Sequence, residues 1–138
     1  MSQESQPEAQ LDSQSDSTLN LFTLGVAQFN QQHFYDCHET LEAFWKNQAM
    51  PEKELTQGII QIAVGHHHLG QGNVKGALKL LVRGNARVQK FLPACMGLNL
   101  TPLHQLVAAN VELLESGCSF NDPRLTIPII ENNESISC

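Results

Sequence analysis

The sequence predicts an all-α fold, in which about five helices form the antiparallel hairpins of a tetratricopeptide-like bundle. Apolar residues recur three and four positions apart over most of the chain. Helix-ending signals, notably Met50-Pro51 and Gly72-Asn73, separate these stretches, because proline disfavours helix in the residue before it and Gly-Asn tolerates left-handed backbone. Displacing the chain on itself by forty residues also superimposes one predicted helix pair on the next.

The chain of 138 residues divides into three predicted parts. Residues 1–17 are mostly Ser, Gln and acids, and we expect a disordered polar tail, because so few apolar side chains cannot offset the entropy of ordering. Residues 18–120 carry the helical pattern and form the predicted domain. Residues 121–138 contain two prolines, which predicts an extended segment that packs across the bundle and ends in frayed residues.

The first two helices are predicted from their apolar spacing and their ends. Ser17 or Thr18 can cap the first helix, which extends to residue 31. A short connection leads to the second helix, over residues 33–47, which stops before Pro51.

The remaining helices also have recognisable ends. The third helix is predicted over 51–71, since acids in its first turn suit the positive end of the helix dipole. The fourth is predicted over 74–92, between the Gly72-Asn73 turn and Pro93. Thr101 is expected to cap the fifth helix, which Pro102 begins and Gly117 ends.

Two strings of residues in the first four helices resemble a known family. They are Phe34-Tyr35-x-Cys37-His38-Glu39-x-Leu41-Glu42-x-x-Trp45 and Gly58-x-Ile60-Gln61-x-Ala63-Val64, followed by His68, Gly72-Asn73 and Gly76-Ala77-x-x-Leu80-Leu81. In order and spacing they resemble the family catalogued as domain of unknown function 309, over the range Leu21 to Leu92. The resemblance implies a small, soluble, all-helical protein of prokaryotes or organelles, and it implies no established activity.

The second helix carries the side chains best suited to a binding site. His38 lies on an apolar helical stripe with Glu42 beside it, and Gln61 and His68 share a polar stripe on the third helix. Buried polar groups need partners, so these four residues could form a structural hydrogen-bond network instead. Our main prediction is a helical binding module with a polar pocket between two hairpins. The predicted pocket residues are Tyr35, His38, Glu39, Glu42, Trp45, Gln61 and His68.

A metal-dependent hydrolase is the alternative function. His38-Glu39-x-x-Glu42 resembles the His-Glu-x-x-His pattern of zinc proteases, in which the intervening glutamate is the general base. His38, Glu42 and His68 would then hold a divalent metal. The sequence contains no Ser-His-Asp arrangement or phosphate-binding glycine loop, so we predict no catalytic residues and otherwise expect no cofactor. The adjacent histidines at 66–68 point about 100° apart and cannot converge on one ion, so we assign no function to His66 or His67.

Charge and cysteines limit the partners. The net charge is −6, although Lys75, Lys79, Arg83 and Arg87 form a basic stripe. No aromatic residues alternate with these bases, which argues for a solvated face and against nucleic acid. We expect a small molecule or a protein segment as partner, no membrane, and a cytoplasmic location with the four cysteines reduced. The oligomeric state is left open.

Overall fold

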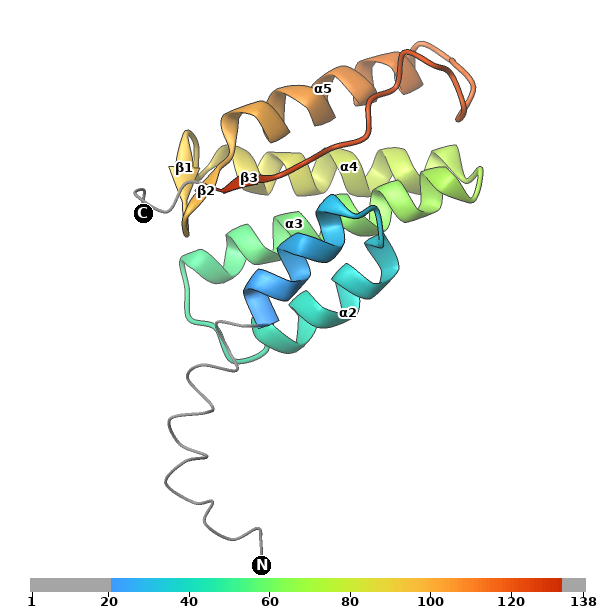
Figure 1. Ribbon diagram of the computed structural model, residues 1–138. Helices are drawn as coiled ribbons and strands as arrows, with labels where there is room; N and C mark the ends of the chain where they lie inside the picture. The colour runs from blue at the N-terminus through green and yellow to red at the C-terminus, as the bar shows by residue number, and fades with distance from the viewer. Residues whose placement is uncertain (1–20, 133–138) are drawn as a thin grey trace, which may run out of the picture.

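The structure, a computed structural model, describes residues 21–132, and most of them are helical (Figure 1). A helical segment at residues 21–30 precedes α2 (Phe34–Trp45), α3 (Glu52–Gly70), α4 (Val74–Gln89) and α5 (Thr101–Glu115). A small antiparallel sheet contains β1 (Ala94–Cys95), β2 (Leu98–Asn99) and β3 (Glu131–Asn132). The predicted helical fold is confirmed over this range. The predicted tail, the start of the first helix and the frayed end lie outside the described residues.

Helix α3 is the centre of the bundle. It packs against α2 and α4, and α4 in turn packs against α5. Leu55, Ile59 and Ile62 on α3 are fully buried, and Leu41 of α2 and Leu81 of α4 are buried with them. Burial of apolar side chains from each neighbour against one helix is the main stabilising contribution to this arrangement.

The first two hairpins use the same turn, forty residues apart. Gln32 and Gly72 both have left-handed backbone, with φ of 67° and 81°. The next amides, those of His33 and Asn73, each donate 2.9 Å to the carbonyl five residues earlier. Such a bond satisfies a carbonyl at the helix end that would otherwise lack a partner. The repeat predicted from the sequence is therefore confirmed in the turn geometry.

The repeat also extends to close helix packing. Gly25 lies against the side chain of Leu41, and Gly65 lies in the same way against Leu81. A Cβ atom at Gly65 would stand 2.8 Å from Leu81 Cδ2, closer than two carbon atoms pack. The glycine in the first helix of each hairpin therefore allows the second helix to pack closely against the first.

A short β-hairpin follows α4 where the sequence predicted helix and then loop. Helix α4 ends at Gln89, three residues before the predicted end. Met96 and Gly97 have φ of 56° and 74°, the left-handed pair typical of a two-residue hairpin turn. Met-Gly is not one of the usual sequence signals for that turn, which is why the hairpin was missed. Thr101 is the first helical residue of α5 and not its cap, which is Leu100.

Two asparagine side chains hold the C-terminal segment against the bundle. Asn110 Nδ2 donates to the Thr126 carbonyl at 2.7 Å, and its Oδ1 accepts from the Thr126 amide at 3.0 Å. Asn30 makes the same pair of bonds with Ile130, at 3.0 and 2.8 Å. Residues of this segment run alongside α5 until β3 pairs with β2 (Figure 1).

The cysteines differ from the expectation. Cys95 is disulfide-bonded, so the prediction of four reduced cysteines is wrong for this residue. Cys37 and Cys118 are free thiols, and Cys138 lies outside the described residues. Within residues 21–132, no helix combines the length and the apolar character that crossing a membrane requires.

Candidate functional site

Some of the predicted pocket residues lie together on the surface beside α2. The ring of Tyr35, which is half exposed, lies 5.6 Å from the His38 ring and 5.5 Å from the His67 ring. His38 Nε2 is 3.8 Å from Glu42 Oε1, and the rings of His67 and His68 are 6.1 Å apart. These residues form an aromatic and histidine patch, while Glu39 is exposed.

Gln61 and Trp45 make their contacts elsewhere. Gln61 Oε1 accepts a hydrogen bond of 3.1 Å from Arg87 Nε, and Arg87 also pairs with Glu54 at 3.2 Å. The Lys53 ammonium stands 4.3 Å from the centre of the Trp45 ring, within cation–π range. Gln61 is therefore part of a cluster of polar contacts and ion pairs between α3 and α4.

The geometry offers little support for a metal centre. His38 Nδ1 is buried and has no hydrogen-bond partner among the described residues. Within residues 21–132, no three His, Cys, Asp or Glu side chains come together in a way that could hold a metal ion. His38, Glu42 and His68 therefore do not form a ready ligand set.

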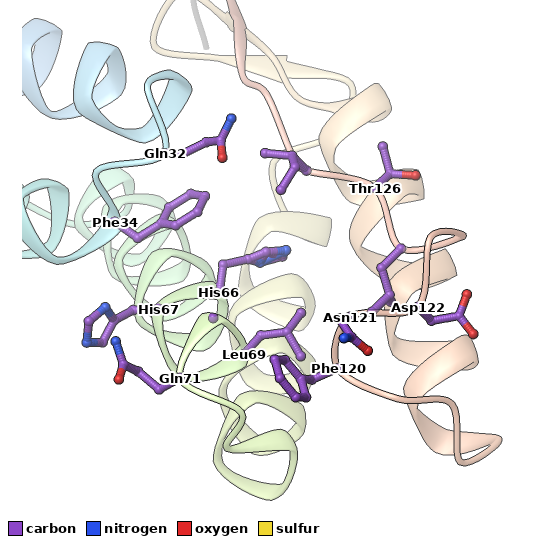
Figure 2. Close-up of a pocket in the computed structure, with 13 residues that line it drawn as sticks. Gln32, Phe34, His66, His67, Leu69, Gln71, Phe120, Asn121, Asp122 and Thr126 are labelled. Carbon is purple, nitrogen blue, oxygen red and sulfur yellow. The ribbon is translucent and has the colours of Figure 1, made fainter.

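A different cavity, of about 420 Å³, opens between the end of α3 and the C-terminal segment (Figure 2). Its size falls within the range of small-molecule sites, about 300–1,000 Å³. The apolar wall is formed by Phe34, Leu69, Phe120, Leu125 and Ile127. The other lining residues are Gln32, His66, His67, Gly70, Gln71, Asn121, Asp122 and Thr126.

His66 is the polar side chain at the centre of this cavity. It is 6% exposed, and neither ring nitrogen has a hydrogen-bond partner among the described residues. Figure 2 shows the His66 ring directed from α3 toward the segment that carries Thr126. The Phe34 ring packs 5.5 Å away. Burial lowers the pKa of His66 to about 4, so the ring is neutral at pH 7 and offers one N–H donor and one acceptor.

The charged group at the rim of the cavity is already paired. Asp122 accepts from Arg124 through both carboxylate oxygens, at 3.0 and 2.9 Å. These bonds hold the pKa of Asp122 near 2. The amide groups of Gln32, Gln71 and Asn121 supply the neutral polar part of the wall. The cavity therefore presents neutral hydrogen-bonding groups beside apolar surface.

Sequence reasoning passed over His66 because it treated the three histidines together. The available signal was its position on the apolar stripe with Leu55, Ile59 and Ile62, a position typical of a buried side chain. The opposite wall of the cavity comes from residues 120–127, whose placement the helical pattern does not predict.

Fold and cavity together define a small helical module with a ligand-sized pocket. Residues 22–80 match the family described as domain of unknown function (DUF309), which confirms the resemblance drawn from the motifs. The matched range includes His66 but not the wall formed by residues 120–127. No curated protein matched the sequence.

Proposed function

We propose that the protein is a binding module that holds a small organic molecule in the cavity around His66. The observation that carries the proposal is the neutral, buried imidazole without a partner for either nitrogen. Each unmet buried hydrogen-bonding group costs about 1–3 kcal/mol, and a ligand that meets both would recover part of that cost. Ordered water would be the competing occupant, because polar cavities of this size hold water.

The proposed site continues into the patch predicted from the sequence. His67 lines the cavity and also contacts Tyr35, with their ring centres 5.5 Å apart. Tyr35, His38, Glu42 and His68 would then form an outer rim, and the role predicted for these side chains becomes recognition of the exposed end of the ligand. The tetratricopeptide-like character of the module, its cytoplasmic location and a protein segment as partner stay predictions.

The metal-dependent hydrolase is the less favoured function. It would need His38, Glu42 and His68 to converge, and residues 21–132 contain no group of three such side chains arranged for a metal. Elemental analysis of untagged protein tests it: stoichiometric zinc, iron or manganese would support the hydrolase against the pocket.

Titration with small phenyl compounds tests the pocket. We expect benzyl alcohol or benzamide to shift the imidazole NMR signals of His66 in a saturable way and to raise the melting temperature. His66→Leu should weaken binding by about tenfold and reduce the rise in melting temperature. His33→Leu, which changes an exposed histidine outside the cavity lining, should keep the wild-type response. If no phenyl compound perturbs the His66 ring, the proposed function is wrong.

A further inference from the structure

We infer that the cavity selects an uncharged ligand that joins an apolar ring to a group with both a hydrogen-bond donor and an acceptor, such as a primary carboxamide or a lactam. This inference rests on the proposed function and adds the chemical class of the ligand. Three properties of the cavity support it: its charge, its hydrogen-bonding groups and its apolar wall.

The charges around the cavity disfavour an ionic ligand. Among residues 21–132, no lysine or arginine lines it, and the acidic lining residue, Asp122, is paired with Arg124. A carboxylate or ammonium group entering this space would lose water without meeting an opposite free charge. An uncharged ligand avoids that loss.

The hydrogen-bonding groups favour a ligand that both donates and accepts. The neutral His66 ring has one donor and one acceptor nitrogen, which point in different directions. A group that both donates and accepts can bond whichever nitrogen faces it, whereas a group that only accepts can bond the N–H nitrogen alone. Carboxamides can pair with either tautomer of the ring. They also match the amides of Gln32, Gln71 and Asn121 on the cavity wall, which themselves donate and accept.

The apolar wall fits a ring. The Phe34 ring, 5.5 Å from His66, is buried, as is Leu69, and both line the cavity. Phe120 and Ile127 are 44% and 50% exposed, and both line the cavity. A ring placed in the cavity against these side chains would remove exposed apolar surface from water and pack against an aromatic face.

A matched series of phenyl compounds tests the inference on the wild-type chain. Benzamide carries the predicted group, benzoate and benzamidine carry opposite charges, acetophenone only accepts, and toluene has no polar group. We expect benzamide to bind more tightly than each of the others at pH 7, by about tenfold or more, which is one good hydrogen bond. Calorimetry gives the affinities, and the His66 imidazole signals report whether the compound reaches the site.

Each outcome has a separate meaning. Benzoate or benzamidine binding as tightly as benzamide would overturn the selection against charge and leave the proposed function in place. Acetophenone or toluene binding as tightly would overturn the need for a donor–acceptor pair. Failure of every compound to shift the His66 signals would overturn the inference and the proposed function together.

Two variants locate the effect. His66→Leu should weaken the affinity for benzamide by about tenfold, to a value close to the affinity for toluene. The reason is that leucine keeps the apolar contact and removes both ring nitrogens. Asn121→Ala changes an exposed residue of the wall, whose amide oxygen accepts a hydrogen bond from Ser119 in the same turn, and it should weaken the binding of benzamide. Unchanged benzamide affinity in both variants would contradict the assigned contacts, and the wild-type series decides the ligand class even if one variant folds poorly.

Discussion

Protonation of His66 should make the stability of the fold depend on pH. Burial lowers the pKa of this residue from 6.5 to about 4, and Asp122, the acidic residue among the described residues that line its cavity, is already paired. Among residues 21–132, the Phe34 ring of α2 packs against the His66 ring, and His67 and Asp122 line the same cavity, with Asp122 paired to Arg124. The folded state therefore favours the neutral ring, whereas the unfolded chain takes up a proton near the ordinary pKa.

The sign and size of the effect follow from the two pKa values. Above pH 6.5 the ring is neutral in both states and contributes no pH dependence. Between pH 6.5 and about 4 only the unfolded chain gains the proton, so the free energy of unfolding falls as the pH falls. At about 1.4 kcal/mol per pH unit, the gap from 6.5 to about 4 is worth about 3 kcal/mol.

Urea unfolding measures this contribution. The fluorescence of Trp45, the single tryptophan, follows the transition at each pH from neutral down to about 4. The difference between wild type and His66→Leu cancels the titration of other groups and should change by about 3 kcal/mol over that range. His68→Leu serves as a control, since it should keep the wild-type fall. Wild-type and His66→Leu curves that run parallel would refute the buried neutral imidazole.

Three further predictions concern packing, tethering and thiol chemistry. Gly84→Ala should lower the free energy of unfolding by about 1–3 kcal/mol, because its Cβ would stand 2.7 Å from a backbone oxygen of α3. Gly70→Ala, with open space around it, should have little effect, and equal urea midpoints for the two variants would contradict the close contact. Asn110→Ala should lower the free energy of unfolding by about 2–3 kcal/mol. It should also speed hydrogen exchange at the Thr126 amide, because this amide donates a hydrogen bond of 3.0 Å to the buried Asn110 side chain. Full protection of the Thr126 amide in the variant would contradict this tether. Burial raises the pKa of the Cys37 thiol to about 12, so iodoacetamide should label it only after unfolding, and mass spectrometry showing rapid native labelling would contradict that.

The helical architecture could be predicted because its causes are local in the sequence. Apolar residues recur on most faces of α3, a pattern typical of a central helix, and Leu55 and Ile59 are fully buried. The Gly72-Asn73 signal marked a turn that the backbone adopts, with Gly72 at φ of 81°. The forty-residue repeat was visible for the same reason, since each hairpin carries its own glycine and turn.

The polar contacts of the site were beyond the reach of these local signals. Gln61 shares a helical stripe with His68, yet its oxygen accepts from Arg87 on the neighbouring helix. The position of a residue on a helical stripe predicts the direction of its side chain, but it does not predict which side chain of another helix lies opposite. The prediction therefore found candidate polar residues without their partners.

The sequence alone determined the helices, because apolar spacing and helix-ending residues are local signals. Only the tertiary structure decided that His66 meets a cavity, because Phe120 and Leu125 reach it from the far end of the chain. Helical periodicity reports interactions between residues three or four positions apart, whereas the C-terminal segment is held by two asparagine amides on distant elements. That tether places a second wall beside an unpaired imidazole and so creates the proposed binding site.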